Sequence, residues 1–188
     1  MFQVCCIMLV LLIATKVMKH ACCKLSQKWL SQFALMMAIV YFIGYMYFTF
    51  FSRTFGSGGF IELRPFYVYT RLFENVIDPW AIPNTFVEKF LNGTLPVHGL
   101  ILNILLYYPL GYLLPILFPK LKPKHVIIIG CLCSIATEAT QYLLKMGWCE
   151  TDDVIHNTLG TAIGVWVWLW QSKRLNLQRS ANPGKGET

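Results

Sequence analysis

Charged residues are scarce in this sequence: 13% of its 188 residues are charged, whereas 56% are hydrophobic. The mean hydropathy is correspondingly high, at +0.52. A soluble domain of this length covers its surface with ionisable and polar side chains, and nine acids with 16 bases are too few to do so. The composition therefore excludes an ordinary soluble domain and predicts that the long uncharged stretches face lipid.

Cysteine is present, but without the spacing of a metal site or of a disulfide framework. The cysteines lie in adjacent or nearly adjacent pairs, apart from the last one: Cys5 and Cys6, Cys22 and Cys23, Cys131 and Cys133, and Cys149. None of these pairs has the two-residue gap that is typical of zinc-binding cysteines. We therefore expect small apolar packing residues, with no metal and no cofactor.

Long apolar runs make up most of the chain. A bilayer core requires a helix of roughly 20 residues. We therefore expect an all-α, polytopic transmembrane bundle of about five spans: residues 2–14, 29–51, 100–118, 125–144 and 154–170. The first run is short, but lysines follow it and no charge precedes it, which is the reverse of a secretory signal peptide. We expect it to be a retained helix.

The distribution of lysine and arginine predicts the orientation, because positive residues close to the ends of spans stay in the cytoplasm. These residues are concentrated after the first run, between the third and fourth runs, and after the fifth. This places the N-terminus outside and the C-terminus inside. The net charge of +7 then reflects topology and anionic lipid head groups, so no nucleic-acid partner is expected.

This topology divides the chain into three parts. Residues 1–28 form the first span and a basic cytoplasmic loop, and residues 29–170 form the main membrane domain. That domain contains an external loop, residues 52–99, whose aromatic side chains are expected at the membrane surface. Residues 171–188 form a basic cytoplasmic tail.

Polar residues inside the apolar runs or at their edges form the candidate site, because an ionisable group in lipid is costly and usually has a partner or a function. Glu138 and Gln141 are three residues apart, and Asp153 and Asn157 are four apart, so each pair shares a helical face. The short turn between the two helices makes them antiparallel neighbours. With Asn103 of the third run, these residues are expected to converge in the outer leaflet as one ligand-binding site.

Packing roles are expected for three other residues. Gly160 and Gly164 have the G-x-x-x-G spacing of closely packed membrane helices. Pro109 lies in the middle of the third run and is expected to kink it. A packing role is also an open alternative for Glu138, which could hydrogen-bond to Gln141 and Asn157 and serve only to set the register of the helices.

Three motifs resemble those of the VanZ-like family. They are N-I-L-L-Y-Y-P-L-G at residues 103–111, E-A-T-Q at 138–141 and D-V-I-H-N-T-L-G at 153–160, in the family's order and with its separations. The segment L-R-P-F at residues 63–66 resembles a short external segment of the family, so the likeness extends from about residue 29 to 170. Departures are Glu150, where an Asp is usual, Arg64, and the long external loop. The resemblance implies a multipass protein of the bacterial cell membrane, in a family named for a member that raises resistance to the glycopeptide teicoplanin.

Two functions remain open. In the first, the polar residues bind an amphiphile at the outer leaflet, such as a lipoglycopeptide antibiotic or a lipid-linked cell-wall intermediate, among the membrane lipids. In the second, Glu138 and Asp153 do acid/base work in an intramembrane enzyme or a proton-coupled transporter. The chain has no evident inverted repeat and no activated serine or cysteine. We therefore favour the first function and do not expect an enzyme.

Overall fold

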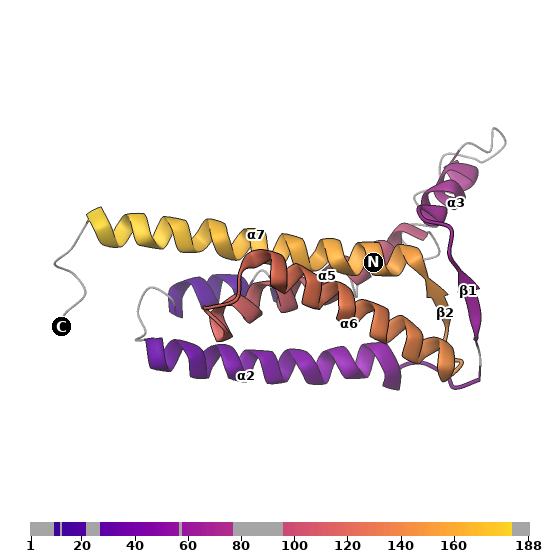
Figure 1. Ribbon diagram of the computed structural model, residues 1–188, viewed down its shortest axis with the longest axis horizontal. Helices are drawn as coiled ribbons and strands as arrows, with labels where there is room; N and C mark the ends of the chain where they lie inside the picture. Colours follow the sequence, from indigo (N-terminus) through magenta and orange to yellow (C-terminus); the bar gives the residue numbers. More distant parts are fainter. Residues whose placement is uncertain (1–9, 12, 22–26, 57, 77–95, 182–188) are drawn as a thin grey trace.

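The computed structural model describes residues 10–11, 13–21, 27–56, 58–76 and 96–181, and most of them are helical (Figure 1). Helical residues 10–11 and 13–21 come first. The elements that follow are α2 (Gln27–Met46), the π-helix η1 (Tyr47–Phe51), β1 (Phe60–Glu62), α3 (Tyr67–Val76), α5 (Pro96–Leu117), α6 (Pro123–Leu143), β2 (Trp148–Glu150) and α7 (Thr151–Ala181). The helical class is as predicted, whereas the two short strands were not expected.

In the part of the chain that the structure describes, three helical segments are long and apolar enough to cross a membrane: Lys28–Phe51, Val97–Leu117 and Pro123–Leu143. They coincide with the second, third and fourth predicted runs. The fifth run lies within α7, which begins earlier and continues to Ala181. The first run lies mostly outside the described residues, and helical residues 13–21 extend past its predicted end at residue 14. The chain thus has the character of a membrane protein.

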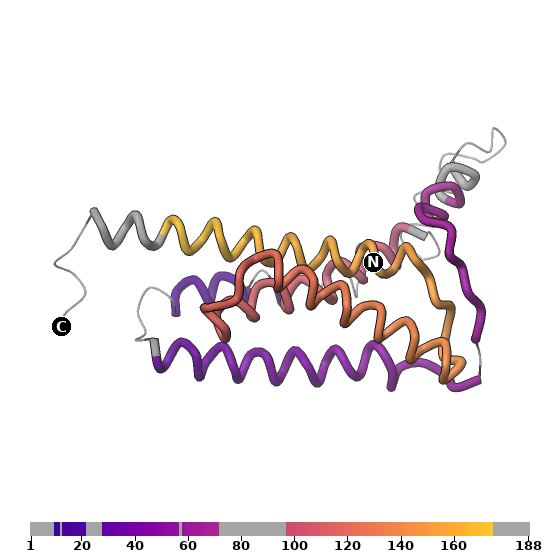
Figure 2. Tube along the Cα trace, viewed as in Figure 1, coloured from indigo at the N-terminus to yellow at the C-terminus, as the bar shows by residue number. Residues whose placement is uncertain are grey.

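The helices alternate in direction, and one end of the bundle carries β1, β2 and α3 (Figure 1). This end is called the sheet end below. Helices α2 and α6 run towards it, whereas α5 and α7 run away from it, with α2 and α7 on opposite sides of the bundle (Figure 2). Since α6 and α7 are joined only by a short segment, they are antiparallel neighbours, as the sequence predicted.

The sheet is a parallel pair in which Phe60 lies beside Trp148 and Glu62 beside Glu150. It forms because the segment after α6 turns sharply. The amides of Lys145 and Met146 donate to carbonyls of the last helical turn, and Lys145 has a φ of 53°, which together make a Schellman-type end. The chain then leaves α6 sideways and can pair with the segment that follows η1.

Glycines let α5 and α7 approach backbone to backbone. A Cβ atom added to Gly160 would lie 2.3 Å from the carbonyl oxygen of Ile104, and one added to Gly164 would lie 2.2 Å from that of Tyr108. On the opposite helix, a Cβ atom at Gly111 would lie 1.9 Å from the carbonyl oxygen of Thr161. We call this contact the glycine seam. It supports the packing role predicted for Gly160 and Gly164.

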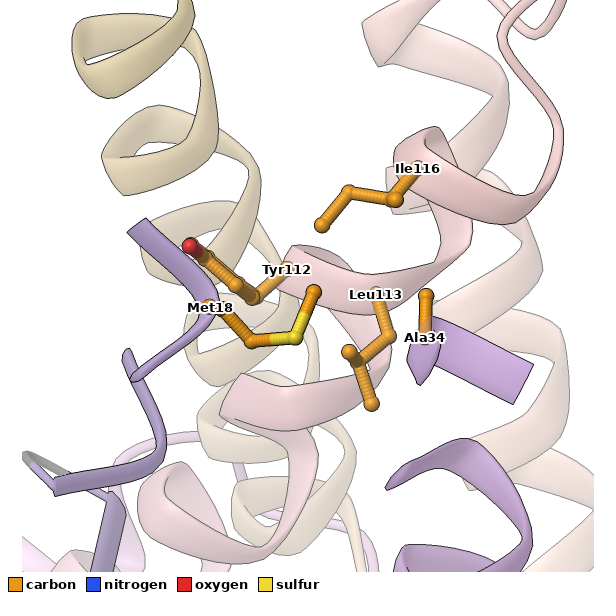
Figure 3. Packing of buried hydrophobic residues seen from close by; sticks show 5 residues of the cluster. All are labelled: Met18, Ala34, Tyr112, Leu113 and Ile116. Atoms are coloured by element: carbon orange, nitrogen blue, oxygen red, sulfur yellow. The ribbon is translucent and has the colours of Figure 1, made fainter. Parts of the chain in front are cut away.

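The apolar core lies away from the sheet end. Its buried side chains come from the first helical residues, α2 and α5: Met18, Ala34, Tyr112, Leu113 and Ile116 (Figure 3). Pro109 is inside α5 and lines a small apolar cavity between α5, α2 and the first helical residues. Helix α5 continues through Pro109 as one α-helix, so this proline contributes to packing without ending the helix.

Candidate functional site

Three carboxylates gather at the sheet end, from α6, β2 and the first turn of α7. Glu138 is only 4% exposed, and its Oε2 accepts a hydrogen bond of 3.3 Å from the backbone amide of Glu150. Asp153 interacts electrostatically with both Glu138 and Glu150. We call Glu138, Glu150 and Asp153 the acidic cluster. Glu138 is buried and the other two residues are partly buried, and carboxylates of like charge held close together away from water are costly, which makes this cluster the main candidate for a function.

Asn103 belongs beside the acidic cluster, as the sequence predicted. It lies in the first half of α5, and its side chain is close enough to interact with the Asp153 carboxylate. The glycine seam explains this pairing, because it fixes the register of α5 against α7 only a few residues further along both helices. Asn103, Glu138 and Asp153 thus come together from three helices.

Gln141 is instead hydrogen-bonded to η1, the π-helix that follows α2. Its Nε2 donates a 3.1 Å hydrogen bond to the backbone carbonyl of Thr49, in η1. Carbonyls in the last turn of a helix have no partner within the helix, so Gln141 caps this one from α6. The amide oxygen of Gln141 has no hydrogen-bond partner among the described residues, although the residue is only 2% exposed.

Asn157 lies one helical turn after Asp153 in α7 and is hydrogen-bonded to a residue of α6. Its Nδ2 donates to Ser134 Oγ at 2.8 Å, and its Oδ1 has no partner among the described residues. The five predicted site residues therefore share one end of the bundle but not one hydrogen-bond network. Asn103, Glu138 and Asp153 are grouped, while Gln141 and Asn157 each have a separate partner.

Arg53 and Arg71 are members of the site that the sequence analysis did not select. Arg53 interacts electrostatically with all three carboxylates of the acidic cluster, and Arg71 with Glu150. Arg53 reaches over the turn between α6 and β2, where a Cβ atom at Gly147 would lie 2.5 Å from its Nη1. The available signal in the sequence is a lone basic residue just after the second apolar run.

Asp152 ties the start of α3 to α7. Its Oδ2 accepts a 2.7 Å hydrogen bond from the amide of Val68, and its Oδ1 accepts one from the amide of Phe66. These amides belong to the free N-terminal end of α3, so Asp152 acts as a cap from a distant part of the chain. One turn along α7, His156 Nε2 is 3.1 Å from the hydroxyl of Tyr69 in α3.

The strand residues at the sheet end have shifted pKa values. Burial raises the pKa of the Glu150 carboxyl, and Asp152 raises it further, while Arg71 and Arg53 oppose the shift. Glu62 lies beside it and behaves oppositely, since hydrogen bonds from Arg64 lower its pKa to about 2. That ion pair is bidentate, at 2.6 and 2.8 Å. Adjacent carboxylates on one small sheet thus have opposite preferences for protonation.

Hydroxyl groups of three helices meet deeper in the bundle. Tyr45 Oη is 2.9 Å from Tyr107 Oη, and Thr137 Oγ1 contacts both tyrosine hydroxyls. Thr137 immediately precedes Glu138 on the buried face of α6. Each hydroxyl has a partner, so this group joins α2, α5 and α6 without presenting a free polar atom.

A comparison with models of known protein families identifies the family of this chain. The VanZ/LLP1 family model matches residues 33–172, which is most of the chain and includes α5, α6 and the first two thirds of α7. The comparison with curated proteins gave no match, and neither did the comparison with solved structures. The match contains the glycine seam, the acidic cluster and all five predicted site residues. This chain is therefore a member of the VanZ/LLP1 family.

Proposed function

We propose that this protein binds an amphiphilic ligand of the cell envelope at the sheet end, in the outer leaflet of the bacterial cell membrane. The observation that carries the proposal is the acidic cluster, where Glu138, Glu150 and Asp153 lie together beside three candidate spans. A bundle that needed only to fix helix register would be served by one satisfied polar pair. The cluster therefore supports recognition of a polar head group next to lipid.

The ligand that we propose is a lipoglycopeptide antibiotic such as teicoplanin, or a lipid-linked cell-wall intermediate. Exposed aromatic side chains surround the cluster, and the rings of Phe60 and Trp148 are 5.2 Å apart on the sheet. Such side chains favour the head-group level of a bilayer. An acyl chain could therefore lie along these rings while the polar part of the ligand contacts the carboxylates.

In this proposal the sheet end is external, and five spans place the N-terminus outside and the C-terminus inside. The basic loop Pro119–Lys124 lies at the opposite end of the bundle, which agrees with a cytoplasmic position for it. Cys149 is a free cysteine at the sheet end. An impermeant thiol reagent should label it in intact cells, and labelling only after permeabilisation would invert this orientation.

The proposal is tested with Glu138→Gln and Asp153→Asn, each expressed in a deletion strain. Both changes keep the shape of the side chain and remove its charge. We expect normal accumulation with at least tenfold weaker binding of a lipoglycopeptide, and loss of any resistance that the wild type confers, because a desolvated charge–charge contact is worth about 1.4 kcal/mol or more. Glu62→Gln, which removes an acid outside the cluster, is the matched control and should bind as the wild type does.

The proposal would fail if both variants bound the ligand as tightly as the wild type. It would also fail if they lost binding only in proportion to lost protein, because the cluster would then be structural. The proximity of Glu138 and Asp153 also favours a second candidate, an intramembrane acid/base function. That candidate predicts that Glu138→Gln retains ligand binding and loses turnover or proton coupling, so a direct binding assay separates the two.

A further inference from the structure

The unpartnered buried atoms near the sheet end are all oxygens. Among the described residues these atoms are Thr49 Oγ1, Gln141 Oε1 and Asn157 Oδ1. The orientation of the Gln141 amide follows from its contact, because the carbonyl oxygen of Thr49 can only accept and the nitrogen must face it. Gln141 therefore presents an obligate acceptor with nothing to accept from.

The acceptors lie next to the acidic cluster. Gln141 is one helical turn from Glu138 on the buried face of α6. Thr49 is one turn from Arg53, whose guanidinium interacts with Glu138. Gln141 Oε1 and Thr49 Oγ1 therefore lie where the end of η1 meets α6, on the buried side of α6 that also carries Glu138. An unpaired buried acceptor costs free energy, so this place is complementary to a group that carries several hydrogen-bond donors and a positive charge.

Arg53 is the cation that acts on the whole acidic cluster, whereas Arg71 acts on Glu150. Arg53 interacts with every carboxylate of the acidic cluster, and its guanidinium is held over Gly147, where only a glycine leaves room for it. A guanidinium matches a phosphate geometrically, because two of its N–H groups can bond to two phosphate oxygens. The site thus places the Arg53 guanidinium, which can bind an anion, beside carboxylate and amide oxygens that can accept hydrogen bonds.

On the basis of the proposed amphiphile-binding function, we propose that the same site also binds an aminophospholipid-type amphiphile of the membrane. Its primary ammonium bonds to the acidic cluster and to Gln141 Oε1, and its adjacent phosphate lies against Arg53. Three N–H donors on one small cation meet the free acceptors, which a quaternary ammonium of the same charge cannot do. A phosphate without an amine would use Arg53 alone and would bring no hydrogen-bond donor to the carboxylates or to Gln141 Oε1.

The test uses purified full-length protein in detergent and three added phospholipids with identical acyl chains. Their head groups are ethanolamine, choline and glycerol. Binding is measured from the shift of the thermal unfolding midpoint with lipid concentration. We expect ethanolamine lipid to bind about tenfold more tightly than choline lipid, because the choline head group has no N–H donors. Glycerol lipid should bind more weakly than ethanolamine lipid by a similar factor.

Two variants test which residue contacts the ammonium of the lipid head group and which contacts its phosphate. Glu138→Gln should reduce the preference for ethanolamine over choline, whereas Arg53→Gln should weaken both lipids and leave their ratio closer to that of the wild type. Glu62→Gln is the matched control and should leave all three affinities unchanged. Should a variant fail to fold, the comparison of the three lipids on the wild type still decides the proposal.

Equal binding of ethanolamine and choline lipids would overturn the inference, and so would glycerol lipid binding as tightly as ethanolamine lipid. Measuring the binding of a lipoglycopeptide to the same variants shows whether only this inference is wrong or the proposed function is wrong as well. If the lipoglycopeptide binds in a Glu138-dependent way and the phospholipids show no preference, the inference is wrong and the proposed function stands. If no amphiphile binds, both are wrong.

Discussion

The glycine seam joins α5 to α7, whereas the sheet end brings α6 together with both of these helices, and the two regions are built in opposite ways. At the seam, Gly160 and Gly164 bring carbonyl oxygens so close that no side chain fits between the backbones. At the sheet end, the buried Glu138 lies near the partly buried Asp153, and the amide oxygen of Gln141 has no partner among the described residues. The residues of the seam serve close helix packing, whereas the sheet end contains polar side chains that helix packing does not require.

The largest expected effect comes from breaking the seam. Gly160→Leu would force a side chain into the backbone of α5, where the carbonyl oxygen of Ile104 lies 2.3 Å from the first added atom. Backbone atoms cannot move aside as the tip of a side chain can, so we expect a loss of about 3 kcal/mol or more in stability. Size-exclusion chromatography of the solubilised protein should show little folded material.

Gly44→Leu is the matched control for this prediction. Gly44 is also a glycine within a helix, but a Cβ atom there would meet nothing within 4 Å. It should accumulate nearly as the wild type does. Equal amounts of folded protein from Gly160→Leu and Gly44→Leu would show that the seam is not needed for the fold.

A smaller and more local effect is expected at the sheet end. Asp152→Ala leaves the amides of Phe66 and Val68 without their acceptor, at a cost of about 1–3 kcal/mol. Because α5, α6 and α7 remain packed, the loss should be confined to the docking of α3. Hydrogen exchange should become faster at Tyr67–Arg71 and stay unchanged in α6.

Asp152→Asn sharpens the same prediction, because its amide oxygen still accepts one hydrogen bond. Its exchange rates should lie between those of the wild type and Asp152→Ala. If α3 exchanged at the wild-type rate in both variants, Asp152 would not be the residue that holds it.

The smallest expected effect is a pH dependence that separates Glu150 from Glu62. Since burial raises the pKa of Glu150 in the folded protein, its contribution to stability is present below its unfolded value and lost as pH rises through the folded value. Glu150→Gln should remove that loss of stability. The difference in thermal unfolding midpoint between variant and wild type should therefore be more favourable to the variant at pH 8 than at pH 4.

Glu62→Gln should act in the opposite direction. The pKa of Glu62 is lowered to about 2 by Arg64, so its stabilising contribution is present above the unfolded value and disappears only as pH falls through about 2. Between pH 5 and 8 this variant should show no change in pH dependence. Parallel pH profiles for the two variants would contradict the assignment of opposite environments to them.

Much of the helical arrangement could be predicted from sequence. Apolar runs longer than about 17 residues must satisfy their backbone groups as helices in lipid, so the segments that became α2, α5 and α6 were recognisable. The spacing of Gly160 and Gly164 indicated close packing, and the i, i+3 and i, i+4 pairs indicated which polar residues share a face. The ends of α7 were not predictable from hydropathy, because charged residues such as Asp153 and Lys173 lie inside a helix that continues past the apolar run.

The sheet end was only partly predictable. Composition and helical period identified Asn103, Glu138 and Asp153, since these residues lie in or beside apolar runs. Arg53 and Asp152 carry no such signal, because each acts on a part of the chain far away in sequence. The pairing of β1 with β2 was also not anticipated, since three-residue strands have no period to detect.

By itself, the sequence determined that this chain is a helical membrane protein of the VanZ/LLP1 family and which faces of its helices are polar. These features depend on local composition and on the 3.6-residue period of a helix. The tertiary structure alone decided that Gln141 caps η1 while Asn157 bonds to Ser134, and that Arg53 lies over Gly147, where it interacts electrostatically with the acidic cluster. Those outcomes depend on the register at which separate helices pack, because a shift of one helical turn would exchange every partner across the interface.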